Sequence, residues 1–132
     1  MKFLLFSFTL LSLSAISSCR KDVTNPNQDI IGNWIWTSSH SSTGTRMFAN
    51  DSSRTFSIAF TKDYHFSNTA YCIVGGPTEG TFEVKEARNG KILILKSQYN
   101  TSDSLELHIE SFHLMLTDTY YSYSWFHDFY KK

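Results

Sequence analysis

The sequence predicts an all-β protein, namely a small antiparallel up-and-down β-barrel of about eight to ten strands. From Ile30 onward, apolar residues alternate with polar ones, and turn residues interrupt this pattern roughly every ten residues. Aromatic residues, which suit strands better than helices, make up 16% of the chain. Sequential hairpins leave two edge strands, and closure into a barrel removes both of them, whereas an open sandwich is the competing architecture.

The first predicted strand begins in the stretch IIGNWIWTSS, residues 30–39, where two tryptophans lie two positions apart. Side chains at alternate positions of a strand share one face, so Trp34 and Trp36 point the same way and Ile35 points the other way. Gly32 allows the chain to bend into this strand without a side chain in the way. We therefore predict that Gly32 and Trp34 close one end of the barrel.

The later strands follow the same alternation. The stretches TFSIAF, TFEV, LELHI and FHLML each place two or three apolar residues on one face, and Asn89-Gly90 marks a tight hairpin. The run KILIL is apolar on both faces, so the pairing of strand faces within residues 81–96 stays open. The residues predicted to line the lumen and bind a ligand there are Trp36, Phe56, Ile58, Phe60, Tyr71, Phe82, Leu107, Leu114, Tyr121 and Tyr123.

Residues 1–18 are predicted to be a signal peptide. A short positive start precedes the apolar run from Phe3 to Ile16, which is shorter than a membrane-spanning helix requires. Small residues then precede Cys19, an arrangement that resembles the lipobox of bacterial lipoproteins. The resemblance implies acylation of Cys19 and cleavage just before it, and an ordinary secreted protein is the alternative. Residues 19–29 are predicted to be the lipidated cysteine with a flexible tether, and residues 30–132 the barrel domain.

Two neighbouring features bear on the compartment. Cys72 is the only other cysteine in the sequence, so acylation of Cys19 excludes a disulfide within the chain. Arg20 follows the cysteine where aspartate would retain a lipoprotein in the inner membrane under the enteric sorting rule. We therefore expect a cell-envelope protein that is held on the outer membrane by its lipid anchor and faces either the periplasm or the cell surface.

The tripeptide GNW at residues 32–34 resembles the G-x-W signature that opens lipocalins. With the lipobox, the IWTSS continuation and the aromatic last strand, the chain resembles the lipocalin-like lipoproteins of the Bacteroidetes from Ile30 to Tyr130. The resemblance implies a barrel that holds a small, largely apolar ligand and needs no cofactor. One departure concerns the floor: lipocalins usually stack an arginine on this tryptophan from near the chain end, where this sequence offers only Lys131 and Lys132.

Charge and motifs limit the remaining function classes. The 12 basic and 12 acidic residues balance, which predicts no nucleic-acid binding. No catalytic or phosphate-binding motif is present, and Cys72 beside His65 fits a buried thiol better than a nucleophile with its base, so we predict a non-enzymatic protein. If Glu110-Ser111 formed a two-residue turn, His108 would oppose His113 and the pair could bind zinc, although a solvated outward pair is the plainer interpretation.

The last predicted strand is aromatic on both faces. Its outward rings are Tyr120, Phe126 and Tyr130. Either residues 38–53 fold over these rings, or the rings form a contact patch for a partner. Two function classes follow: a lipid-anchored protein that binds a small apolar ligand in its lumen, or an interaction module that binds an envelope protein or a glycan through its outer aromatic face or loop rim.

Overall fold

Nine strands make up most of the described part of the chain. The computed structural model describes residues 25–49, 55–70, 74–120 and 123–132, and within them no helix is long and apolar enough to cross a membrane. The strands are β1 (Gly32–Ser41), β2 (Arg46–Phe48), β3 (Ser57–Phe60), β4 (His65–Asn68), β5 (Glu79–Ala87), β6 (Gly90–Lys96), β7 (Ser102–Glu110), β8 (His113–Tyr120) and β9 (Tyr123–Lys131).

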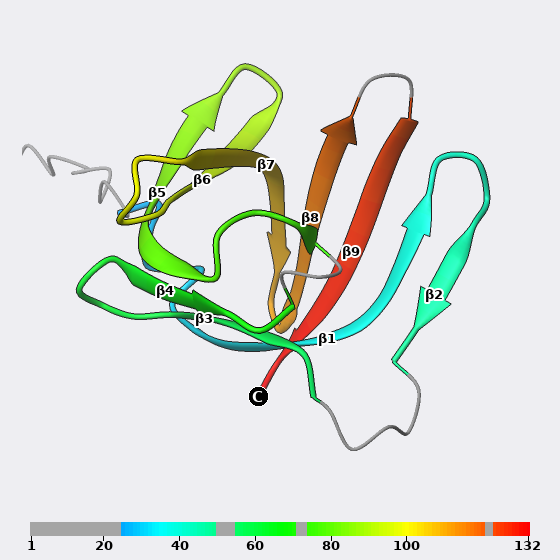
Figure 1. The fold of residues 1–132 in the computed structure, drawn as a ribbon, viewed down its shortest axis with the longest axis horizontal. Coiled ribbons are helices and arrows are strands. Elements are labelled where there is room, and N and C mark those ends of the chain that lie inside the picture. The colour runs from blue at the N-terminus through cyan, green and yellow to red at the C-terminus, as the bar shows by residue number, and fades with distance from the viewer. Residues whose placement is uncertain (1–24, 50–54, 71–73, 121–122) are drawn as a thin grey trace, which may run out of the picture.

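These strands form one antiparallel sheet that closes on itself. Their order is β2-β1-β3-β4-β5-β6-β7-β8-β9, and β9 also pairs with β1 (Figure 1). Eight strands, β1 and β3 to β9, therefore form a ring, while β2 lies outside it beside the later half of β1. The prediction of a small antiparallel up-and-down barrel is confirmed, and the open sandwich is excluded.

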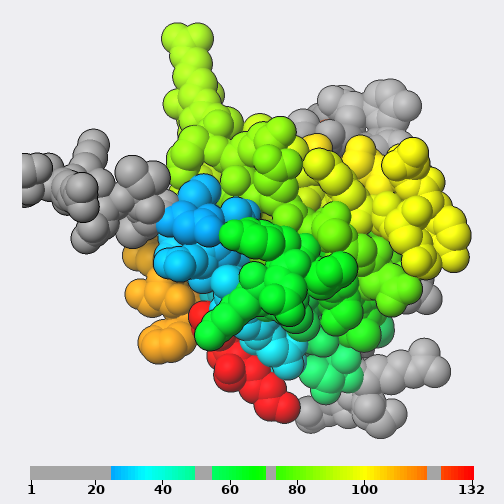
Figure 2. All heavy atoms as spheres, turned by 90° about the vertical axis from the view of Figure 1, so that its left-hand side faces the viewer, coloured from blue at the N-terminus to red at the C-terminus, as the bar shows by residue number. Residues whose placement is uncertain are grey.

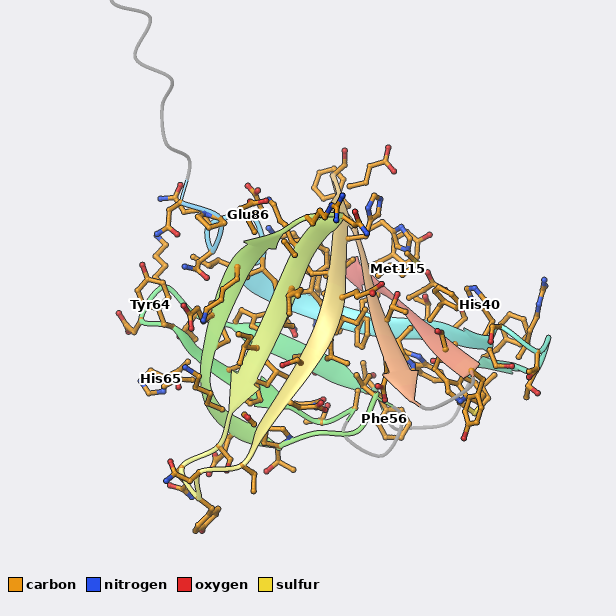
Figure 3. All side chains as sticks on the ribbon, turned by 90° about the horizontal axis from the view of Figure 1, so that it is seen from above. His40, Phe56, Tyr64, His65, Glu86 and Met115 are labelled. Atoms are coloured by element: carbon orange, nitrogen blue, oxygen red, sulfur yellow. The ribbon has the colours of Figure 1, made fainter. Side chains whose placement is uncertain are left out.

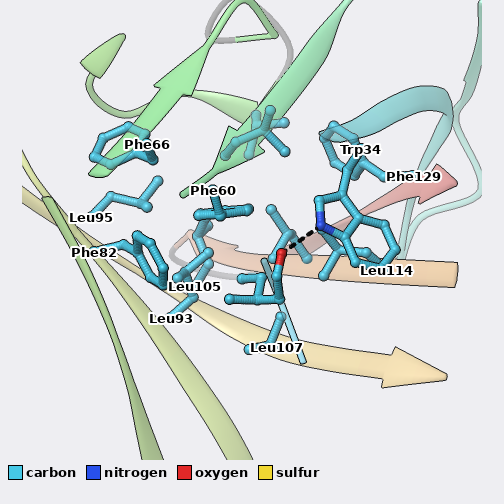
Figure 4. Close-up of a cluster of buried hydrophobic side chains, with 14 of the residues drawn as sticks. Trp34, Phe60, Phe66, Phe82, Leu93, Leu95, Leu105, Leu107, Leu114 and Phe129 are labelled. Atoms are coloured by element: carbon cyan, nitrogen blue, oxygen red, sulfur yellow. Dashed lines mark hydrogen bonds between the residues drawn. The ribbon is translucent and has the colours of Figure 1, made fainter. Parts of the chain in front are cut away.

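The interior of the ring is one apolar cluster, part of which Figure 4 shows. On β6 the inward residues are Leu93 and Leu95, which settles the face that the run KILIL left open. The buried apolar residues are Ile30, Trp34, Trp36, Ile58, Phe60, Phe66, Ala70, Val74, Phe82, Val84, Leu93, Leu95, Leu105, Leu107, Leu114, Leu116 and Phe129.

The β5–β6 hairpin turns one residue earlier than its sequence suggests. Ala87 pairs with Gly90, so the two turn residues are Arg88 and Asn89 rather than Asn89 and Gly90. Gly90 has a φ of +144°, a conformation that side-chain-bearing residues rarely adopt, and it therefore fits the first position after the turn.

Lys131 stacks on Trp34 at the end of the barrel where β1 begins and β9 ends, which we call the floor. The Trp34 indole is fully buried, its Nε1 donates to the Ile30 carbonyl at 2.7 Å, and Lys131 Nζ lies 5.2 Å from the centre of its ring. A lysine therefore supplies the cation over this tryptophan. Gly32 makes room for it, since a Cβ at Gly32, where φ is +143°, would lie 2.7 Å from Lys131 Cε.

The segment before β1 packs across this floor from Asn25 onward. Asn27 Oδ1 accepts a hydrogen bond from Val84 N at 2.7 Å, and Asn25 Nδ2 donates to the Tyr64 hydroxyl at 3.1 Å. We expected a flexible tether as far as Asp29. The two asparagines instead bind the barrel, so residues 25–29 belong to the folded unit, whereas Cys19 and the predicted signal peptide lie outside the described residues.

At the opposite end, which we call the mouth, the ring divides. A β-bulge between Trp36 and Ser38 bends β1, whose first residues pair with β3 and whose later residues pair with β2. In the described pairings, residues 102–105 of β7 join only β6, and residues 118–120 of β8 join only β9. The mouth-side parts of β8, β9 and β1, with β2, therefore stand apart from the other strands (Figure 1), and we call them the extension.

Candidate functional site

Inward side chains of β8, β9 and β1 form three cross-strand rows that change in character toward the mouth. Each row contains one residue from each strand, and residues in a row lie opposite one another on neighbouring strands. The row nearest the floor is apolar, and the middle row is mixed. The row nearest the mouth contains a carboxylate, an indole and a hydroxyl. The rows are Leu114, Phe129 and Trp36; Leu116, His127 and Ser39; and Asp118, Trp125 and Ser41.

The predicted lumen residues divide between the packed core and the mouth. Phe56 is half-buried and packs against the core, and Tyr123 is 44% exposed at the mouth end of β9. Tyr71 and Tyr121 lie outside the described residues. The other predicted lumen residues are buried in one apolar cluster, part of which Figure 4 shows; they are Trp36, Ile58, Phe60, Phe82, Leu107 and Leu114. Because these side chains bury one another, the candidate ligand site lies at the mouth.

A hydrogen-bonded chain crosses the middle row. Trp36 Nε1 donates to Ser39 Oγ at 2.8 Å, and Ser39 Oγ lies 2.7 Å from His127 Nδ1. Ser39 Oγ accepts from the indole N–H, which leaves its hydroxyl hydrogen available, and we assign this hydrogen to Nδ1 of a neutral imidazole that carries its own proton on Nε2. Burial lowers the pKa of His127 to about 4; the charge of Asp128 opposes this effect and the charge of His40 adds to it. The ring is therefore uncharged at neutral pH.

A serine beside a histidine is also the arrangement of a nucleophile and its base. Here, however, Ser39 is 1% exposed, and its hydroxyl is held between two other side chains. Trp125 stacks on His127 with ring centres 6.3 Å apart and planes 10° apart. We therefore interpret Ser39 and His127 as a polar seal that lies over the apolar core and supports the Trp125 indole at the mouth.

Two further polar groups lie around the mouth. The pKa of Asp118 is raised, first by burial and second by the nearby negative charge of Asp103. Asn68, on the inner face of β4, is buried; its Nδ2 donates to the carbonyls of Gly75 and Pro77, whereas its Oδ1 has no hydrogen-bond partner among the residues that the structure describes. A buried acceptor without a donor is costly, so a ligand that brings a donor would bind favourably there.

On the outer face of the sheet formed by β8, β9 and β1, Asp128 joins three strands. His113 Nε2 of β8 lies 2.9 Å from Asp128 Oδ1, while Ser38 Oγ of β1 donates to Oδ2 at 3.1 Å. His40 Nδ1, also from β1, lies 3.7 Å from Oδ2. Asp128 therefore points away from its neighbour His127, in agreement with the alternation of the strand.

The outward aromatic rings of β9 are stacked against these histidines. The rings of Phe126 and His40 stack with centres 4.9 Å apart, and those of Tyr130 and His113 stack at 5.0 Å. We considered that residues 38–53 fold over this face. Residues 38–41 instead continue β1 and pair with β9, and they contribute His40 to the cover.

The predicted opposition of His108 and His113 is wrong. The β7–β8 turn is Ser111-Phe112, with Ser111 at a φ of +53°, so His113 pairs with Glu110 and His108 pairs with Met115. His113 contacts Asp128 instead of a second histidine. Across the described ranges, no three His, Cys, Asp or Glu side chains are placed to hold a metal ion.

The remaining sequence candidates are His65 and Cys72. His65 is exposed on β4, and its suggested partner Cys72 lies outside the described residues. His127 and Asp118 are not among the predicted site residues, although the alternation that places Trp125 and Leu116 inward also places them inward when it is continued by two residues. Ser39 is not among them either, because the bulge in β1 reverses the alternation after Trp36.

Comparisons of the chain with protein-family models, with curated proteins and with solved structures found no match.

Proposed function

We propose that this protein is a lipid-anchored binding protein of the bacterial cell envelope, which takes up a small, largely apolar ligand at the barrel mouth. The apolar run before Cys19 and the small residues beside it support the anchor. More than one acyl chain makes such attachment stable. Arg20, directly after Cys19, supports the outer membrane as the location. The proposal includes no enzymatic step and no cofactor.

The binding proposal is supported by the change of the inner wall from apolar side chains at the floor to polar and aromatic side chains at the mouth. At the floor, Leu114, Phe129 and Trp36 are buried in the packed core. At the mouth, the row that contains Asp118 and the half-buried Trp125 has polar and aromatic side chains in place of this packed apolar core. A folded domain does not need such side chains for its own core. Ligand sites commonly combine an apolar wall with a few polar groups of this kind.

The same residues indicate what the ligand offers. The rings of Trp125, Tyr123 and Phe56 provide apolar and flat surfaces for its body. Asn68 Oδ1 is an acceptor without a partner among the described residues, and the carboxylate of Asp118 accepts as well. We therefore propose an apolar ligand with at least one hydrogen-bonding group.

Native mass spectrometry of the lipidated protein purified from its own membrane tests this proposal. We expect a co-purifying small molecule, and we expect Trp125→Ala to lower its occupancy several-fold. Phe112→Ala is the matched control, because Phe112 is an aromatic residue that is 71% exposed on the β7–β8 turn at the opposite end of the barrel. Equal occupancy in the two variants, or an empty wild-type protein, contradicts the proposal.

A second candidate function has its own supporting observation. Met47 and Phe48 are exposed on β2, which is the end strand in the sheet order. An end strand can pair with another chain, and these side chains would add apolar contact. We propose on this basis an interaction module for an envelope protein as the alternative. A stoichiometric partner in the same mass spectra, without a small molecule, favours it.

A further inference from the structure

The folded unit begins very close to the proposed lipid anchor. Asn25 is six residues after Cys19, and an extended chain spans at most about 3.6 Å per residue, so the acylated cysteine lies within roughly 20 Å of Asn25. Asn25 is itself bound to the barrel through the Tyr64 hydroxyl. One end of the barrel is therefore kept near the bilayer whenever Cys19 is acylated.

That end is the floor. The up-and-down topology places alternate turns at alternate ends, so the turns at residues 61–64, 88–89 and 111–112 lie at the same end as the N-terminal segment and Lys131. Figure 3 shows Tyr64 and Glu86 on the side where the described chain begins, with His40 of the extension far from them. Figure 2 shows the N-terminal segment in blue beside green residues of the β3–β4 region.

Two aromatic side chains stand out from turns on either side of this segment. Phe112 is 71% exposed and Tyr64 is 44% exposed. One hollow is lined by Asn25, Gln28, Lys62 and Tyr64, and a second by Gln28, Asp29, Ser111 and Lys131, which places both turns beside the N-terminal segment. Aromatic residues accompanied by lysines are the side chains that favour the membrane–water interface.

We propose that the floor of the barrel rests on the bilayer interface through Phe112 and Tyr64, and that the mouth faces away from this membrane. This inference rests on the proposed acylation of Cys19 and adds an orientation to it. A ligand then enters from the aqueous compartment, and the extension is presented to that compartment rather than to lipid.

The contact depends on rings more than on charge. Basic and acidic residues at the floor nearly balance, so no strong attraction to anionic lipid is expected. They are Lys62, Arg88, Lys91, Lys131 and Lys132 against Asp29, Asp63, Glu86 and Glu110. Two of the basic residues are also engaged within the protein, because Lys91 pairs with Asp29 at 3.3 Å and Lys131 lies over Trp34. Zwitterionic phosphatidylcholine vesicles are therefore a sufficient probe.

The experiment introduces a reporter tryptophan at either end of the lipidated protein. Phe112→Trp places it at the floor, and Tyr99→Trp places it on the exposed β6–β7 turn at the mouth end. Both proteins are reconstituted into phosphatidylcholine vesicles whose lipids carry bromine near the headgroups. Relative to the wild-type emission, we expect bromine to quench the added emission of Phe112→Trp several-fold more than that of Tyr99→Trp.

Each outcome decides a separate point. Equal quenching, or stronger quenching of Tyr99→Trp, overturns the orientation while the anchor stands. Mass spectrometry of the N-terminal peptide tests the anchor independently: an unmodified Cys19 overturns the proposed lipoprotein and this inference with it. Both positions are exposed turn residues, so the substitutions leave the core intact.

Discussion

Lowering the pH from 7.5 to 5 should destabilise this protein through a single buried histidine. His127 is 2% exposed, and burial lowers its pKa from 6.5 to about 4. Between these two values the unfolded chain binds a proton that the folded chain does not. The part of the free energy of unfolding that depends on neutral His127 is therefore fully present above pH 6.5, and it is lost as the pH falls toward 4.

The size of the effect follows from this difference. At about 1.4 kcal/mol for each pH unit, the shift from 6.5 to about 4 corresponds to roughly 3 kcal/mol, of which about 2 kcal/mol is lost by pH 5. That is a large part of the 5–15 kcal/mol, roughly, that holds a small domain together. Asp118 acts in the opposite direction, because its raised pKa lets the folded chain take up a proton more readily as the pH falls.

Urea denaturation, followed by tryptophan fluorescence at several pH values, measures this effect. The comparison is with His127→Gln, in which an uncharged amide can still bond to Ser39 Oγ while every other titrating group is retained. We expect the free energy of unfolding of the wild type to fall by about 2 kcal/mol more than that of the variant between pH 7.5 and 5. Parallel pH profiles for the two proteins would refute the assignment of a neutral, desolvated imidazole.

Two further predictions concern the anchor and the floor. Cys19→Ser should leave the precursor unacylated and uncut by the lipoprotein signal peptidase, and a mature acylated product in mass spectra of that variant would disprove the anchor. Gly32→Ala should lower the free energy of unfolding by about 1–3 kcal/mol, because alanine is strained at a φ of +143° and its Cβ would meet Lys131 Cε. An unchanged urea midpoint would contradict this prediction, because it would show that the barrel accommodates alanine at this position without loss of stability.

The sequence predicted the architecture because strand alternation is a local signal. Leu105 and Leu107, or Phe82 and Val84, are inward in the structure for the same reason that they share a face in the sequence. Residues 92–95 could not be resolved locally, since both faces of β6 are apolar there. Only pairing with β5 and β7 decides which residues point inward, and pairing is a tertiary property.

The candidate site was predicted less completely, because it depends on register. His108 and His113 are close in sequence, and a turn only one position earlier would place them opposite each other. The turn at Ser111-Phe112 pairs His113 with Glu110 instead. The stacking of Lys131 on Trp34 could not be predicted from local sequence patterns either. It joins residues from the first and last strands and arises only when β1 and β9 pair.

The bulge in β1 decides what both faces of the extension contain. Strict alternation from Trp34 and Trp36 would turn Ser38 and His40 inward and Ser39 outward. The extra residue at the bulge reverses this order, so Ser39 meets His127 inside while Ser38 and His40 meet Asp128 outside. The contact of Ser39 with His127 in the polar seal and the contacts of Ser38 and His40 with Asp128 therefore have one cause, a single inserted residue. The pairing of β1 with β3 ends at Ile35 and its pairing with β2 begins at Ser38, so the bulge lies at the point where the extension leaves the barrel and the wall becomes polar.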